Sequence, residues 1–166
     1  VLTYNAGDEA ERRAAELYKA ELAKLGIDLD IRAMPWEQQW DLAKSLDPTA
    51  RQDIFVMYWW PDIAGDPYTF LYNQFHSRYP PFFNMAYYNN TEFDGLIDSA
   101  FQLTGTNKAE AKRLYIQAQK ILVEDAPAIF VYDQQYVRYL RSWFKGYVDD
   151  PSYPHVVFFY FVWREG

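Results

Sequence analysis

The sequence has 166 residues, the length of one domain by the rule of about 100 to 200 residues per domain. Charged residues make up 23% of it, close to ordinary globular domains, which excludes intrinsic disorder, whereas aromatic residues make up 20% and are unusually frequent. The 16 Lys and Arg against 23 Asp and Glu give a net charge of −7. Because no basic run is present, we expect no nucleic-acid partner.

Several classes of chemistry are missing from the sequence. It contains no cysteine and no G-x-S-x-G, P-loop or G-x-G-x-x-G pattern. His76 and His155 share no metal-ligand spacing and are expected at the surface or in loops, so we expect neither a metal nor a cofactor. No apolar run approaches the roughly 20 residues of a membrane helix. Since the chain begins at Val1 rather than Met, we expect a processed chain or a piece of a longer one.

The first third of the chain predicts the order β-α-β-α-β. The expected elements are a strand at 1–5, an amphipathic helix over 8–25, an alternating strand at 27–33, a weaker helix over 35–46 and an apolar strand at 54–58. Such units form parallel sheets with right-handed crossovers, and ligands gather beyond the carboxyl ends of the strands. We therefore expect an α/β fold, with a mostly parallel central sheet flanked by helices.

The rest of the chain begins with an irregular segment, 59–90, that is rich in proline and aromatic residues. Long loops of this kind are usually functional. Proline at its first turn marks a short helix at 67–75, and two further helices are expected to pack as a pair. The later elements are helices starting at 90 or 91 and at 107, and strands at 128–132, 136–140 and 156–163 that can be antiparallel.

The strongest candidate site follows the third strand directly. Tyr58, Trp59 and Trp60 precede Asp62 and Asp66 there. A carboxylate can pair with an ammonium group while an aromatic ring covers the apolar part of a ligand, so this segment suits a cationic or amino-bearing molecule. The competing interpretation makes both carboxylates turn or cap residues. It is favoured for Asp66, which precedes a proline at a helix start, and is left open for Asp62.

Two other function classes compete with ligand binding. The paired carboxylates Asp62 and Asp66 would suit a glycosidase-like enzyme. A spacing of four residues in a loop fixes no catalytic geometry, however, so we expect no enzyme. The third class is a protein-interaction domain whose exposed aromatic residues bind a partner chain.

Five segments, in order, resemble the peptide-binding class of extracytoplasmic solute-binding proteins, family 5, which serves ATP-driven importers and includes oligopeptide, dipeptide and nickel binders. The segments are 15–31, 59–67, 88–100, 112–127 and 144–147. The resemblance covers most of the chain.

This resemblance implies a periplasmic-binding-protein-like fold of two lobes, of which residues 1–166 would be the C-terminal, ligand-binding lobe. It implies non-catalytic binding of a peptide or other small solute, with an N-terminal lobe and a membrane importer permease as partners. The location would be periplasmic or extracytoplasmic, with a lipoprotein anchor in the full-length form. The family's ligand-pairing Asp in W-x-x-D falls on Asp62, with Trp59 before it. Asp66 is the fallback because the spacing to Asp66 is one residue longer here.

The aromatic residues divide into three groups. Tyr18, Phe93, Phe101 and Tyr115 are expected in helix cores. Those in 58–88 are expected to line the ligand cleft, and those in 153–163 to face the other lobe. One lobe offers only half a pocket, so we expect weak solute affinity of this chain alone. Since the 153–163 group would be exposed without the other lobe, we also expect this chain to self-associate.

Overall fold

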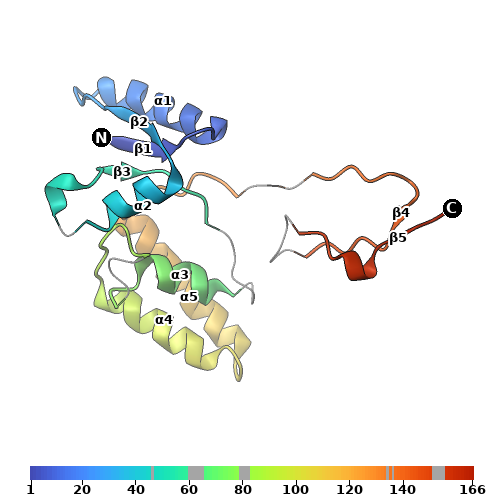
Figure 1. The fold of residues 1–166 in the computed structure, drawn as a ribbon. Helices are drawn as coiled ribbons and strands as arrows, with labels where there is room; N and C mark the ends of the chain where they lie inside the picture. The colour runs from blue at the N-terminus through green and yellow to red at the C-terminus, as the bar shows by residue number, and fades with distance from the viewer. Residues whose placement is uncertain (46, 60–65, 79–82, 134, 136, 151–155) are drawn as a thin grey trace.

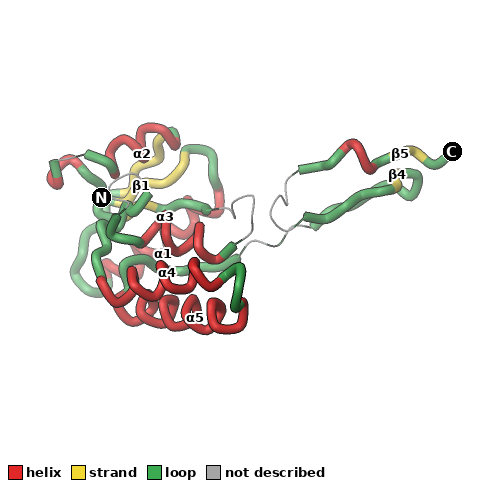
Figure 2. The backbone as a smooth tube through the Cα atoms, turned by 90° about the horizontal axis from the view of Figure 1, so that it is seen from below, coloured by secondary structure: helices red, strands yellow, loops and turns green. Residues whose placement is uncertain are grey.

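A computed structural model describes residues 1–45, 47–59, 66–78, 83–133, 135, 137–150 and 156–166. An α/β unit at the N-terminus lies beside a group of three helices, and a thin C-terminal arm extends away from both (Figures 1 and 2). Among the described residues, no helix is long and apolar enough to cross a membrane.

The predicted parallel sheet is confirmed. Its strands are β1 (Leu2–Asn5), β2 (Ile31–Met34) and β3 (Ile54–Phe55), in the order β2-β1-β3. All are parallel, with Leu2 beside both Ile31 and Ile54.

Strand β3 is shorter than predicted because a carboxylate interrupts its ladder. The Val56 amide still donates to the Thr3 carbonyl (3.2 Å), but the next donor toward β3, the Asn5 amide, donates to Oε2 of Glu11 instead (2.7 Å). After the Val56 amide, residues 57 and 58 therefore lie outside the strand.

Helices α1 (Glu9–Ala23) and α2 (Trp36–Ala43) cover opposite faces of the sheet (Figure 1). Asp8 caps α1 by accepting two amides of its first turn. Leu2, Ala15 and Leu29 form a small core on the α1 side. On the α2 side the fully buried residues include the polar Thr3 and Gln39. A short 3₁₀ turn, η1 (Pro48–Ala50), precedes β3.

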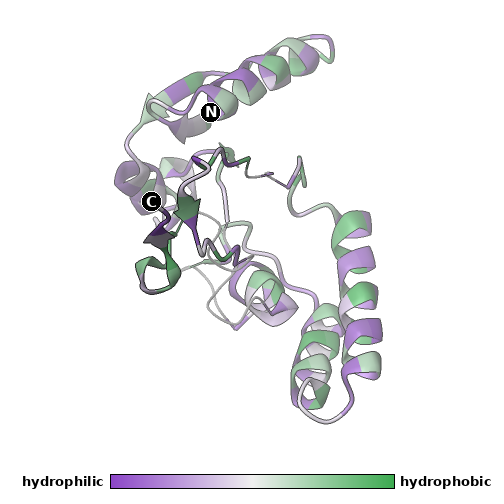
Figure 3. Cartoon of the chain, turned by 90° about the vertical axis from the view of Figure 1, so that its right-hand side faces the viewer, coloured by the Kyte–Doolittle hydropathy of each residue, from purple (hydrophilic) through white to green (hydrophobic). Residues whose placement is uncertain are grey.

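The larger core lies between α3 (Pro67–Phe75), α4 (Thr91–Leu103) and α5 (Lys108–Asp125), which confirms the predicted helices and the pairing of the last two. Asn90 and Asn107 cap α4 and α5. Hydrophobic and hydrophilic residues mix along the helices, as amphipathic helices require (Figure 3). The buried core residues are Leu71, Phe75, Phe93, Ile97, Ala100, Ala111, Leu114, Tyr115, Ala118 and Leu122.

One predicted core residue is wrong. Phe93 and Tyr115 are buried, and Tyr18 is half-buried, but Phe101 is 53% exposed. Its ring stacks on Tyr68 of α3, with centroids 4.1 Å apart. The helical spacing of Phe101 is correct, but it falls at the margin of the apolar face.

The predicted C-terminal strands are also wrong where they are described. No described residue of 128–140 is in a strand, and only β4 (Phe144–Lys145) and β5 (Trp163–Arg164) pair, antiparallel, with a 3₁₀ turn η2 (Phe159–Phe161) before β5. Ile129 and Val131 are 67% and 62% exposed. A strand needs a backbone partner as well as apolar side chains, and the described residues supply none here.

Candidate functional site

The predicted site lies where β3 leaves the carboxyl end of the sheet. Trp60 and Asp62 lie outside the described residues, whereas Tyr58, Trp59 and Asp66 are described. Tyr58 and Trp59 stay at the exit of β3, but Asp66 belongs to the start of α3.

Tyr58 is tied to a residue far away in the sequence. Its hydroxyl oxygen lies 2.6 Å from that of Tyr132, and the two rings meet edge to face with centroids 6.3 Å apart. Burial and this hydrogen bond raise the pKa of Tyr58, so its hydroxyl stays neutral. Tyr132 is a neighbour that sequence reasoning missed, because no local pattern reports such a long-range contact.

Trp59 belongs to a continuous row of rings that we call the aromatic wall. Each ring is half-buried, and each lies 5.1–5.5 Å from the next, measured between centroids. The row draws rings from α2, β3 and the loop before α4. In order, its members are Phe55, Trp36, Trp40, Phe83 and Trp59. The sequence predicts Trp59 as a ligand-packing residue and places Phe83 in the cleft-lining group 58–88, but it does not predict the contribution of Phe55, Trp36 and Trp40.

Residue Asn84, next to Phe83, is a fully buried hydrogen-bonding centre. Its side-chain nitrogen donates to the Tyr88 carbonyl (2.8 Å) and lies 3.5 and 3.4 Å from the carbonyls of Phe75 and His76. Its Oδ1 accepts the Tyr88 amide (3.0 Å). The loop 83–88 is thereby closed onto the end of α3.

The same loop is also attached to α2. The Tyr87 hydroxyl donates to the Ala43 carbonyl (2.8 Å), and the Arg51 guanidinium lies 3.8 Å from the centroid of the Tyr87 ring. Tyr87 adopts a φ of 52°, in the left-handed region that a bulky residue rarely occupies. These contacts hold it there.

Asp66 serves as the N-cap of α3, which confirms the capping interpretation. Its Oδ1 accepts the Tyr68 amide (2.7 Å), and Pro67 occupies the first helical turn. The expectation that Asp66 replaces Asp62 as a ligand partner stays a prediction.

His76 lies in the loop just after α3, as expected, but it is buried, so the expected surface position is wrong. Its Nδ1 accepts the Arg78 amide (3.1 Å), and its Nε2 lies 3.4 Å from Oδ1 of Asp98. The Ser77 amide and hydroxyl both donate to Asp94. Since these contacts join the end of α3 to α4, we assign His76 to packing. Among the described residues, no group of three or more His, Asp and Glu is arranged to hold a metal, and His155 lies outside them.

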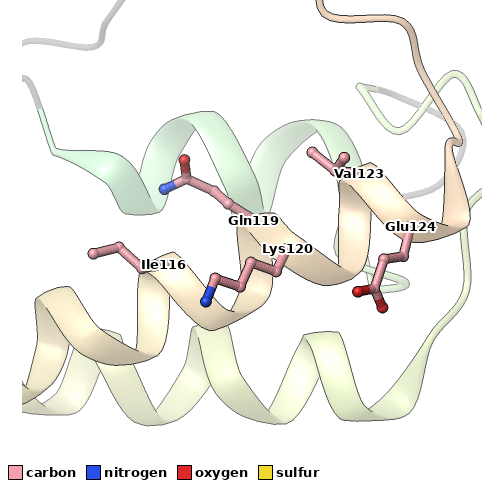
Figure 4. A pocket seen from close by; sticks show the side chains of 5 residues that line it. All are labelled: Ile116, Gln119, Lys120, Val123 and Glu124. Carbon is pink, nitrogen blue, oxygen red and sulfur yellow. The ribbon is translucent and has the colours of Figure 1, made fainter.

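A separate surface hollow lies on α5 (Figure 4). All the side chains that line it come from this one helix, so no groups from other elements converge on it as they do in a ligand site. They are Ile116, Gln119, Lys120, Val123 and Glu124.

Comparisons with known proteins show which family this chain resembles. A family model described as bacterial extracellular solute-binding proteins, family 5 Middle, matches residues 1–81. Heme-binding protein A of Haemophilus influenzae is 36% identical over 140 residues, which cover 84% of this chain and 24% of that protein. The probable D,D-dipeptide-binding periplasmic protein DdpA of Escherichia coli is 31% identical, over 83% of this chain and 26% of its own length.

A solved structure shows the same fold. It is the ABC transporter-associated periplasmic binding protein DppA from Helicobacter pylori in complex with the peptide STSA, with a TM-score of 0.62 and 25% identity. The match covers 76% of this chain and 24% of that one. The present chain thus spans about a quarter of the length of these similar proteins.

Proposed function

The chain belongs to the bacterial extracellular solute-binding proteins of family 5, and we propose that it forms one wall of a site for a peptide-like, amino-bearing solute. One observation carries this proposal: the strand exit that leads to Asp62 places Trp59 in an aromatic wall at the carboxyl end of a parallel sheet. Binding is non-catalytic, and the solute is passed to an ATP-driven importer.

The similar proteins support the class of solute. The E. coli relative is named as a probable D,D-dipeptide binder, and the H. pylori structure holds a peptide. The latter is also described as associated with an ABC transporter. By the same analogy, residues 1–166 correspond to the C-terminal lobe, which meets an N-terminal lobe outside the cytoplasm, on a protein that a lipid anchor can hold at the membrane.

The roles of the side chains follow from their chemistry. Asp62 pairs with the ammonium group of the solute, while Trp59 and Trp60 pack against its body. Tyr58 contributes a ring edge and a hydroxyl that is already bonded to Tyr132. Asp66 is the less suitable carboxylate because Oδ1 already accepts the Tyr68 amide.

The test compares a free peptide with its N-acetylated form, which has no ammonium group. Chemical-shift titration of the 166-residue chain with Ala-Phe-Ala is expected to show weak, millimolar binding, because one lobe offers half a pocket. Acetylation should weaken binding several-fold, and Asp62→Asn should remove that difference while the matched control Asp66→Asn keeps it. Equal binding of both peptides to the unmodified chain, or a preference that survives Asp62→Asn, contradicts the role of Asp62.

A further inference from the structure

Phe83 is the ring that joins the two halves of the aromatic wall. Its centroid lies 5.1 Å from that of Trp59, at the β3 exit, and 5.3 Å from that of Trp40, on α2. Both pairs are edge to face, with interplanar angles of 78° and 70°, an arrangement that aromatic rings favour. Replacing Phe83 by a small residue would therefore separate Trp59 from the α2 rings.

The position of Phe83 is set by Asn84 rather than by the wall itself. The Asn84 side chain is fully buried, and both its oxygen and its nitrogen bond the backbone of Tyr88. Leaving such a buried amide or its partners unpaired is costly, so the start of the loop is fixed against the end of α3.

The other end of the loop is fixed against α2. Tyr87 bonds the carbonyl of Ala43, the last residue of α2, and Trp40 lies less than one turn earlier on that helix. The loop therefore bridges α2 and α3 and holds Phe83 against Trp40. A surface held in place beforehand loses little conformational entropy when a ligand binds.

The rings of the aromatic wall are more exposed to solvent than the aromatic rings of the core. Phe75 and Phe93 are 5% and 0% exposed, whereas every ring of the wall is half-buried. Trp59 follows β3 and contacts Phe83, so these two half-buried rings present apolar surface near the carboxyl end of a parallel strand, where a ligand of such a sheet lies.

We propose that the aromatic wall receives an aromatic side chain of the solute, that Phe83 determines this preference, and that Asn84 is its positioning residue. The proposal rests on the proposed function and adds the class of side chain that the site selects. Offset or edge-to-face contact with Phe83 and Trp59 supplies the preference, while the ammonium group is recognised separately through Asp62.

The experiment compares two peptides, Ala-Phe-Ala and Ala-Ala-Ala, by chemical-shift titration of the 166-residue chain. The unmodified chain should bind the phenylalanine peptide about fivefold more tightly, as one or two aromatic contacts allow. Phe83→Ala should reduce that ratio to below about twofold. Phe101→Leu, which alters an exposed ring on α4, is the matched control and should leave the ratio unchanged.

The ratio also tests the positioning role of Asn84. Asn84→Asp is expected to lower the ratio of the affinity for Ala-Phe-Ala to that for Ala-Ala-Ala. General loosening of the fold would instead weaken the binding of both peptides equally and leave this ratio unchanged. Phe83→Leu keeps the bulk of the side chain and serves if Phe83→Ala does not fold. A ratio near one in the unmodified chain, or one unaffected by Phe83→Leu and Phe83→Ala, overturns the proposal. If the preference for a free over an acetylated amino terminus persists in that case, the proposed function itself stands.

Discussion

The hydroxyl oxygens of Tyr58 and Tyr132 lie 2.6 Å apart although 74 residues separate them in the sequence. Tyr58 follows the last strand of the parallel sheet, and Tyr132 follows α5. The pair therefore connects the exit of β3 to the chain beyond the helical group, next to Trp59.

A double-mutant cycle measures this connection. We expect Tyr58→Phe and Tyr132→Phe each to lower the free energy of unfolding slightly, with a coupling of at most about 1 kcal/mol, because Tyr132 is largely exposed. Urea unfolding of both variants and the double variant gives the coupling. Fully additive effects would show that the hydroxyl pair contributes nothing to stability.

The carboxyl group of Glu11 makes stability depend on pH. Burial raises the pKa of Glu11 above its ordinary value of 4.5, although the hydrogen bond from the Asn5 amide opposes this shift. The folded state thus holds the proton of Glu11 more tightly than the unfolded state does. The contribution of Glu11 to the free energy of unfolding therefore falls as pH rises from about 4.5 through the raised pKa.

Glu11→Gln keeps an acceptor for the Asn5 amide and removes the charge. The variant should be more stable than the unmodified chain at pH 7, and the difference should shrink as pH falls below about 4.5. Denaturant unfolding between pH 4 and 8 checks this, with the exposed Glu124→Gln as the control. A difference that does not change with pH contradicts the assignment.

Asp66 allows capping to be separated from charge. Asp66→Ala removes the acceptor of the Tyr68 amide and should lower the free energy of unfolding by about 1 kcal/mol. Asp66→Asn keeps a good cap and should cost little. Thermal unfolding of both variants tests this; equal losses would mean that the charge, rather than the cap, stabilises α3.

The elements that the sequence predicted well are those with local causes. Asp8, Asp66, Asn90 and Asn107 cap helices in the structure. The apolar spacing of α5 agrees with the face that is buried, and that of α4 does so except at Phe101. Capping and periodicity involve residues within one or two turns, so a single sequence contains them.

The features that could not be predicted depend on partners distant in the sequence. The length of β3 depends on where the Glu11 carboxylate binds, and the burial of His76 depends on carboxylates of α4. The contact of Phe83 with Trp40 depends on Asn84 and Tyr87, which attach its loop to two helices. The run 128–132 has the apolar composition of a strand, but its described residues form none because no other backbone segment pairs with them.

Gly146 is expected to be irreplaceable in the C-terminal arm. It has a φ of 76°, and an added Cβ would overlap both the Phe161 carbonyl oxygen and the Trp163 ring. Gly146→Ala should therefore abolish the pairing of β4 with β5. Loss of nuclear Overhauser effects between Phe144 and Arg164 would report this.

Gly95 provides the matched control. It lies within α4, and an added Cβ there meets no atom within 4 Å. Gly95→Ala should stabilise the chain by up to about 1 kcal/mol, since alanine favours a helix interior. If Gly146→Ala retains the β4–β5 contacts, the tight approach in the arm does not restrict that position.

The aromatic C-terminal arm is expected to make this chain self-associate. Phe159, Tyr160 and Trp163 are 78%, 93% and 60% exposed on a segment that extends away from the helices (Figure 2). Exposed apolar surface of this kind marks an interaction site, and in a two-lobe protein the other lobe would cover it. Light scattering should show a mass that rises with concentration, and Phe159→Ser with Tyr160→Ser should restore a monomer.

The matched double variant Ile116→Ser with Val123→Ser removes exposed apolar residues from α5 instead and should leave the association unchanged. A monomer at all concentrations in the unmodified chain, or association lost equally in both variants, would show that the arm is not the contacting surface.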